Sequence, residues 1–315
     1  MADSSQKQPR IFLWCWPRSI STAVEKCLSF VDGMQTWHEP YTVAFNAELL
    51  SNKAIMKEGT DSDSPISKVL QQYMEMVKML TDKPNEFSGG KFMPIANFTY
   101  PFIKGELEKE EPGKKYIFIK DMAIAVLDHL DALPDVPTRH TFIIRHPYRF
   151  LSSQRNMFLR ISNYQGDPKE FDMFKASPVV SDTIFQRDGM HWMWKHVQES
   201  GKDPHPIVID AEDVMNHPEI ILPKYFHELG IPFDKKYLTW DESIESIRKT
   251  WKGALEQVAL GYRMGVFDKA FKSSCFNPSA HVMPKREELT PDILKILDFV
   301  LPGYEEMYEN RIKPE

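Results

Sequence analysis

The sequence predicts an α/β fold in which a central parallel sheet is flanked by helices. Short, continuously apolar runs recur along the chain, as expected for strands that are buried on both faces of a parallel sheet. Each run ends in polar or turn residues and is followed by a segment with apolar residues at helical spacing. Such alternation favours right-handed crossovers and places ligands outside the carboxyl ends of the strands.

Composition agrees with a folded α/β protein. The chain has 315 residues, of which 42% are hydrophobic and 27% charged, so it can bury a core. We expect a flexible tail over residues 1–9 and a single domain over residues 10–315. The net charge of −6 argues against a nucleic-acid or membrane partner. The sequence has no signal-like or membrane-spanning apolar run. Its three cysteines lack metal-ligand spacing. We therefore predict that the chain is cytoplasmic.

The first predicted elements are a strand over residues 11–15, a turn, and a helix from Ala23 to Val31. Ile-Phe-Leu-Trp-Cys forms the strand, and Trp16-Pro17-Arg18 breaks it. Apolar residues then recur at helical spacing, with Cys15 and Cys27 expected in the core. Further strands are predicted over residues 34–37, 116–119, 141–144 and 207–209. Helices are predicted over residues 46–58, 66–80, 122–130, 148–157, 183–200 and 219–229. Residues 81–101 are predicted as an irregular insertion near the site, and residues 163–182 as a loop, with a lid as one interpretation.

The turn after the first strand is a candidate anion site. Ser19, Ser21 and Thr22 carry hydroxyls where a helix begins, and free backbone N–H groups with the helix dipole attract phosphate there. Arg18 adds a fork of donors that matches phosphate or sulfate oxygens. An ordinary capped helix is the competing interpretation, but the arginine inside the turn favours anion binding.

A second candidate anion site follows the strand over residues 141–144. Arg145 leaves the strand end, and Ser153 lies two helical turns further on. A guanidinium and a hydroxyl could together hold one phosphate. Taken alone, Arg145 could equally be a structural ion-pair residue and Ser153 a helix-surface residue.

Taken together, these segments resemble the sulfotransferases. Pro-Arg-Ser-Ile-Ser-Thr-Ala, residues 17–23, resembles the family's 5′-phosphosulfate loop, with Ile20 where the family has glycine. Arg145-His-Pro followed by Ser153 resembles the motif for the 3′-phosphate. Residues 208–232 resemble a later, structural segment. Residues 271–276, including Ser274, resemble a serine-containing loop of some bacterial-type members, with a plain surface turn as the competing interpretation. The resemblance implies the following donor-binding residues: Arg18, Ser19, Ile20, Ser21, Thr22, Ala23, Arg145, Ser153 and Ser274.

The resemblance implies a P-loop-type three-layer sandwich. It also implies transfer of a sulfuryl group from 3′-phosphoadenosine-5′-phosphosulfate (PAPS) to a hydroxyl or amine of a small-molecule acceptor, with PAP as the product. No metal is implied. A homodimer is left open.

The branches of the family differ in the residue that removes the acceptor's proton. Cytosolic sulfotransferases carry Lys-Thr-His after the strand that matches residues 116–119, whereas this chain has Lys120-Asp121-Met122. Other branches use a glutamate at the end of the second strand, where Glu39 lies next to His38. The chain therefore resembles the bacterial-type branch more closely. We expect Glu39 to be the base, with Asp121 behind it, and we expect Lys120 and His38 in the catalytic site.

Two other functions are left open. A nucleotide-dependent kinase or phosphotransferase is disfavoured because no Walker lysine follows a glycine-rich loop. A binding protein of the same fold that has lost activity is the other. An apolar acceptor pocket could be lined by aromatic residues, which are more often part of a core: Trp37, Tyr41, Phe45, Phe98, Tyr100 and Phe102.

Overall fold

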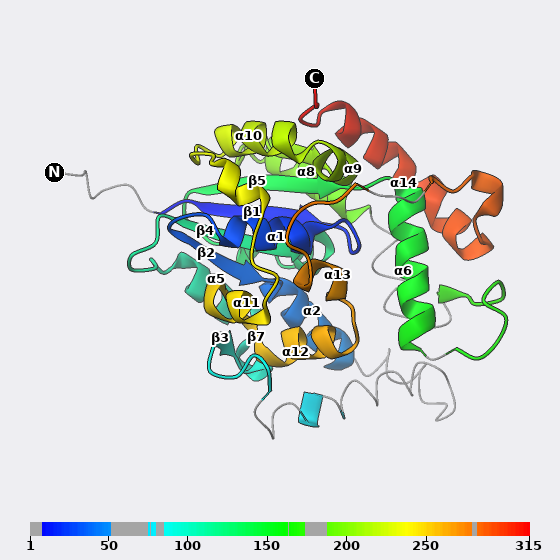
Figure 1. The fold of residues 1–315 in the computed structure, drawn as a ribbon, viewed down its shortest axis with the longest axis horizontal. Helices are drawn as coiled ribbons and strands as arrows, with labels where there is room; N and C mark the ends of the chain where they lie inside the picture. The colour runs from blue at the N-terminus through cyan, green and yellow to red at the C-terminus, as the bar shows by residue number, and fades with distance from the viewer. Residues whose placement is uncertain are drawn as a thin grey trace.

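A parallel sheet forms the centre of the molecule (Figure 1). The computed structural model describes residues 8–51, 75, 77–79, 85–162, 164–173, 188–278 and 282–315. Within them the sheet has seven strands in the order β3-β7-β2-β4-β1-β5-β6, and every neighbouring pair is parallel. The strands are β1 (Arg10–Cys15), β2 (Met34–His38), β3 (Lys91–Met93), β4 (Tyr116–Met122), β5 (Thr138–Ile144), β6 (Ile207–Asp210) and β7 (Trp251–Ala254).

Helices cover both faces of this sheet. The α-helices are α1 (Ser21–Ser29), α2 (Pro40–Ser51), α5 (Tyr100–Glu108), α6 (Pro147–Ile161), α8 (Gly189–Glu199), α9 (Ala211–Asn216), α10 (Pro218–Glu228), α11 (Ile244–Thr250), α12 (Leu255–Arg263), α13 (Asp268–Phe271) and α14 (Pro291–Glu309). Short 3-10 helices are η1 (Ile95–Asn97), η2 (Ala123–Val126), η3 (Leu130–Ala132), η5 (Lys235–Leu238) and η6 (Arg286–Glu288).

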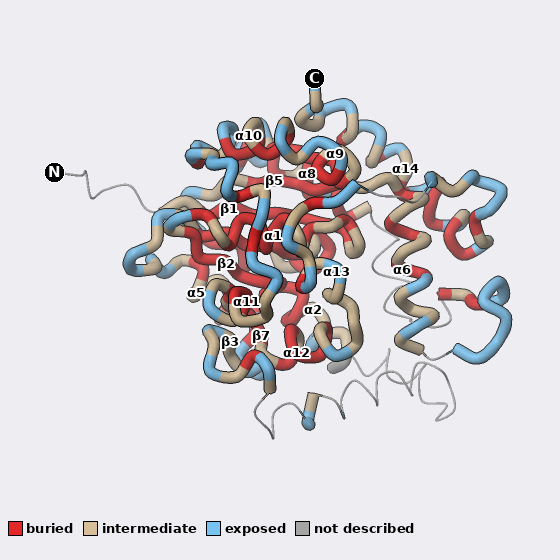
Figure 2. The backbone as a smooth tube through the Cα atoms, viewed as in Figure 1, coloured by how far each residue is buried: buried red, intermediate tan, exposed pale blue. Residues whose placement is uncertain are grey.

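Strand β1 shows how the three layers are held together. Phe12 and Trp14 point to one face, where they pack into a core shared with helices α2, α6, α8 and α14. Ile11 and Leu13 point to the other face, where α1 and α10 cover them. Because strand side chains alternate between faces, the part of a strand that is covered on both sides is apolar on both faces, as Ile11 to Cys15 are. The predicted α/β three-layer sandwich is confirmed, and Figure 2 shows its central strands, such as β1, buried.

The five strands predicted from the sequence are all present, but the sheet has two more. β3 lies at the edge and pairs only with β7, which pairs with β2 in turn. The prediction that residues 81–101 are irregular is therefore partly wrong, since residues 91–93 form β3 and α5 begins at Tyr100. Strands of three and four residues are too short to show a clear apolar pattern.

Some helix predictions need correction. The segment over residues 122–130 is not an α-helix: Met122 ends β4, and 3-10 turns follow, which pack against α2 and α8. Helix α2 begins at Pro40, six residues earlier than predicted, because the Asp121 side chain of β4 caps its first turn. Most of the predicted helix over residues 66–80 lies outside the described residues. Residues 163 and 174–182 of the predicted loop over residues 163–182 also lie outside them, and residues 164–172 form no helix or strand.

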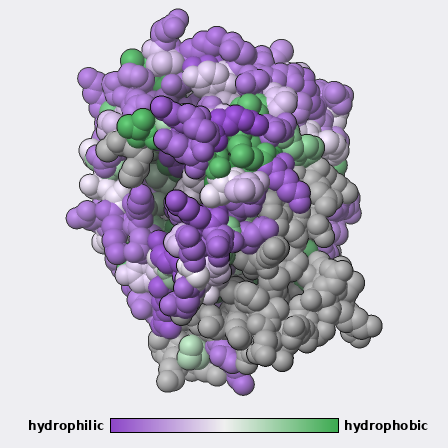
Figure 3. All heavy atoms as spheres, turned by 90° about the vertical axis from the view of Figure 1, so that its right-hand side faces the viewer, coloured by the Kyte–Doolittle hydropathy of each residue, from purple (hydrophilic) through white to green (hydrophobic). Residues whose placement is uncertain are grey.

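The carboxyl ends of the strands point toward α6, on the right-hand side of Figure 1. Figure 3 views this side and shows mainly hydrophilic side chains among the described residues, with smaller hydrophobic groups between them. No helix in the described part of the chain is long and apolar enough to cross a membrane. Cys15 and Cys27 are buried, as predicted, and burial raises the pKa of the Cys15 thiol to about 11 and that of Cys27 to about 12.

Candidate functional site

The carboxyl edge of the sheet brings together the segments that the sequence singled out. Strand β1 lies between β4 and β5: strands β2 and β4 lie on one side of it, and the strands that follow them, β5 and β6, lie on the other. In open parallel sheets, ligands bind outside the carboxyl ends of the strands at such a point. The turn after β1 carries Arg18, while His38 of β2 lies opposite Lys120 of β4 in the sheet register.

Backbone strain is concentrated at this edge. Among the described residues, three that are not glycine have a positive φ: Arg18 (66°), Ile20 (59°) and Glu39 (49°). Left-handed backbone is unfavourable for most side chains, and it is most unfavourable for a β-branched one. Ile20 thus adopts the conformation for which glycine is suited. Strain of this kind persists where the surrounding structure imposes it and is common at functional sites.

The turn leaves the start of α1 open to an anion. Ser19 is buried, and its Oγ donates a hydrogen bond to the Trp16 carbonyl (2.7 Å), so this hydroxyl shapes the turn. Helix α1 begins at Ser21 with no side chain capping it. The first backbone N–H groups of a helix have no partner within the helix, and those of Ser21 and Thr22 are in this position. Together with the helix dipole they favour a negatively charged ligand.

Arg18, Arg145 and Ser153 lie together. Nε of Arg18 donates to Oγ of Ser153 (3.1 Å), and Nη1 of Arg145 donates to the Arg18 carbonyl (2.8 Å). Nε of Arg145 also donates to Oε1 of Glu212 (3.0 Å), which fixes the direction of its guanidinium. Burial and the charges of Arg160 and Arg145 lower the pKa of Arg18. The crowded positive charge would be relieved by a bound anion.

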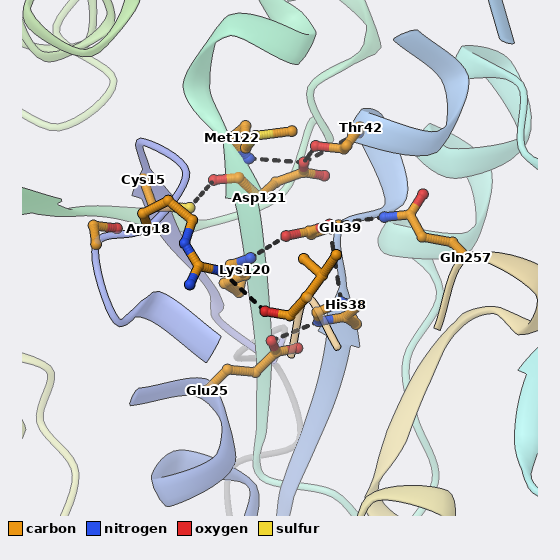
Figure 4. Close-up of polar contacts among 12 residues, drawn as sticks. Cys15, Arg18, Glu25, His38, Glu39, Thr42, Lys120, Asp121, Met122 and Gln257 are labelled. Carbon is orange, nitrogen blue, oxygen red and sulfur yellow. Dashed lines mark hydrogen bonds and ion pairs between the residues drawn. The ribbon is translucent and has the colours of Figure 1, made fainter. Parts of the chain in front are cut away.

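A buried ion pair joins β4 to the end of β2 (Figure 4). Nζ of Lys120 donates to Oε1 of Glu39, and Glu39 Oε2 accepts from Nε2 of Gln257 in α12 at 2.7 Å. Lys120 is 2% and Glu39 8% exposed. Burial favours the neutral form of each, but the opposite charge outweighs it and holds the pKa of Glu39 below and that of Lys120 above its usual range. Both residues are therefore charged near neutral pH.

Asp121 is fully buried and acts on the start of α2. Its Oδ2 accepts from the Tyr41 N–H (2.6 Å), and its Oδ1 accepts from the Thr42 N–H (3.1 Å), the Thr42 hydroxyl (2.6 Å) and the Met122 N–H (2.8 Å). A carboxylate at this position satisfies the first N–H groups of the helix. Burial raises the pKa of Asp121 to about 7, although these donors favour its charged form. The three contacts from Tyr41 and Thr42 hold α2 against β4.

His38 is buried between Glu25 and Glu39. Its Nδ1 lies 2.7 Å from Oε2 of Glu25, and its Nε2 lies 3.9 Å from Oε2 of Glu39. The sequence analysis missed Glu25 and Gln257. Glu25 stands beside the apolar residues of α1 without any distinguishing signal, and Gln257 is 218 residues away from Glu39.

Other predicted residues lie apart from these contacts. Ser274 is exposed, and its carbonyl accepts from the Trp240 N–H (2.8 Å); within the described residues it has no hydrogen bond to the arginine cluster. The predicted pocket aromatics Trp37, Tyr41, Phe98 and Tyr100 are buried in the main core, and Phe45 and Phe102 pack against it.

The comparisons with known proteins do not assign a function to the chain, so its function is inferred from the site. No family model matches the chain, and no curated protein matches it. Among solved structures, it is similar to a sulfotransferase domain from the Synechococcus PCC 7002 olefin synthase, at 15% identity and a TM-score of 0.45, covering 94% of this chain and 95% of that one. It is also similar to a sulfotransferase domain from the curacin biosynthetic pathway, at 15% identity and a TM-score of 0.46, covering 93% and 98% of the two chains.

Proposed function

We propose that this protein is a sulfotransferase that moves a sulfuryl group from PAPS to a hydroxyl or amine of a small molecule. One observation carries the proposal. Arg145 and Ser153 both contact Arg18, which lies in the turn before the open start of α1, and this cluster lies at the same sheet edge as the Glu39–Lys120 pair. An anion site beside a paired base and cation is what transfer of a charged group requires.

The donor would be held through its two charged ends. Arg18 and the backbone at the start of α1 would bind the 5′-phosphosulfate, with Ser21 and Thr22 supplying hydroxyls. Arg145 and Ser153 would bind the 3′-phosphate. The Arg145–Arg18 contact links the two ends, so that binding of one end orders the loop for the other.

Lys120 and Glu39 would act as a coupled pair. In the free protein, Lys120 lowers the pKa of Glu39 and so makes it a weak base. If Lys120 turns to the oxygens of the transferring group, it stabilises their growing negative charge. Glu39 then loses its cation and becomes a stronger base for the acceptor's proton. Gln257 keeps the carboxylate in place while this occurs.

Selective binding of PAP over AMP tests the proposed donor. The two nucleotides differ by the 3′-phosphate, so calorimetry should show much tighter binding of PAP. Arg145→Ala should reduce this preference more than it reduces stability, because it removes a charge-assisted contact to that phosphate. Equal affinity of the wild type for PAP and AMP would contradict the proposal.

Arg18→Ala should weaken PAPS binding by about 1.5–3 kcal/mol, the usual contribution of a hydrogen bond to a charged group. Turnover should fall as well. Arg18→Lys is the matched control, since it keeps the charge but loses the planar fork, and it should retain part of the affinity. Circular dichroism would verify folding. A folded Arg18→Ala variant with wild-type affinity and turnover would place the loop outside the site.

The same titrations separate the competing functions. Tight binding of ATP with phosphoryl transfer to an acceptor would indicate a kinase. Tight binding of PAP without turnover of PAPS across a broad acceptor screen would indicate an inactive binding protein.

A further inference from the structure

The Glu25–His38 pair takes no part in the chemistry proposed for Lys120 and Glu39, yet it lies directly behind Glu39 (Figure 4). Glu25 is 0% and His38 1% exposed. Two buried polar atoms of this pair have no hydrogen-bond partner among the described residues: Nε2 of His38 and Oε1 of Glu25. An unpaired polar atom in a buried position is costly and is retained where it has a role.

The His38 ring is held on all sides. It stacks on Trp251 with the ring centres 4.9 Å apart, and the edge of Phe267 meets it at 5.1 Å. Gly253 of β7 lies beside it: a Cβ there would come within 3.0 Å of the His38 carbonyl and 3.4 Å of the His38 Cβ. The packing therefore keeps Nδ1 toward Glu25 and Nε2 toward Glu39.

The neighbouring charges determine where the ring carries its proton. The ionisable groups near His38 are Glu25 of α1, Glu39 at the end of β2 and Lys120 of β4. Nδ1 lies at hydrogen-bond distance from a Glu25 oxygen, while Nε2 is 3.9 Å from Glu39, too far for a hydrogen bond. A neutral ring with its proton on Nδ1 donates to Oε2 of Glu25 and leaves a lone pair on Nε2.

We propose that Glu25 is a positioning residue: it holds His38 with the proton on Nδ1, so that Nε2 receives the acceptor's proton from Glu39. This inference rests on the proposed sulfotransferase function. As the bond from the acceptor to sulfur forms and the bond from sulfur to PAP breaks, the acceptor's proton passes to Glu39. Once Lys120 has turned away, the Glu39 carboxylate closes the 3.9 Å gap to Nε2 of His38, and the proton passes to that nitrogen. Glu25 balances the resulting imidazolium charge. The proton returns through Glu39 to solvent after the product leaves.

Replacement of Glu25 by methionine tests the proposal. Without Glu25, the remaining carboxylate near the ring is Glu39, which lies on the Nε2 side and should draw the proton there. Nitrogen-15 NMR of the histidine-labelled protein should therefore show the proton on Nδ1 in wild type and on Nε2 in Glu25→Met. Turnover should fall about 10²-fold, the lower end for a positioned acid–base group, with PAP affinity unchanged.

Two further variants serve as controls. Glu25→Gln keeps an acceptor for Nδ1 without the charge, so it should retain the wild-type tautomer with an intermediate loss of turnover. Glu48→Gln alters another histidine–glutamate pair, with His129 Nε2 3.0 Å from the carboxylate, and should leave turnover unchanged.

The outcomes distinguish the two proposals. A wild-type ring protonated on Nε2, or wild-type turnover in folded Glu25→Met, would overturn the role of Glu25 alone. A wild-type protein that binds neither PAP nor PAPS would overturn the proposed function, whichever tautomer His38 shows, and the proton path with it.

Discussion

Glu39→Gln is expected to lower turnover by about 10²–10⁴-fold while PAP binding stays close to that of wild type. Glutamine keeps the size of Glu39 and its contact with Gln257, but it cannot take the acceptor's proton. Among the catalytic candidates, Glu39 is buried but is the most exposed, at 8%, and it lies beside Lys120. Steady-state kinetics with PAPS and an identified acceptor, together with PAP calorimetry, would measure both quantities.

Two parallel variants show whether the loss belongs to Glu39. His38→Gln should lose less turnover, because it lies one step behind the base. Asp121→Asn should also lose less turnover but lower the stability, since an amide would place a donor against the N–H groups that Asp121 accepts. If Glu39→Gln keeps wild-type turnover while Asp121→Asn is folded and inactive, Asp121 is the base and our assignment is wrong.

Lys120→Met is expected to lower the free energy of unfolding by about 3–5 kcal/mol. The substitution leaves Glu39 charged and buried without its cation, and removal of one partner from a buried pair is much more damaging than removal of both. Urea unfolding followed by fluorescence would measure the change.

The double variant Lys120→Met with Glu39→Gln should recover part of this loss, because no isolated charge remains. Lys104→Met breaks a pair with Asp135 that is largely exposed and should change stability by less than about 1 kcal/mol. A Lys120→Met protein as stable as wild type would show that the pair is not charged in the folded state.

The sequence alone determined five of the seven strands and placed the candidate anion site at their carboxyl ends. Strands such as Ile11–Cys15 are apolar throughout because both of their faces are covered, and this pattern is visible without the fold. Arg18 and Arg145 could be identified because each follows such a strand, and parallel strands end at one edge. Strand β7 had no such signal, since it has four residues and its sequence, Trp-Lys-Gly-Ala, shows no continuous apolar run.

Only the tertiary structure decided what the polar residues at this edge do. Asp121 and Glu39 are both acidic residues at the ends of strands, yet Asp121 caps α2 by accepting three hydrogen bonds from it, and Glu39 pairs with Lys120. Glu25 and Gln257 reach the site from α1 and α12, and neither stands in a motif. Their roles depend on contacts between residues far apart in the chain, which local patterns do not encode. Burial then makes each contact strong, because a buried charge must find its partner within the fold.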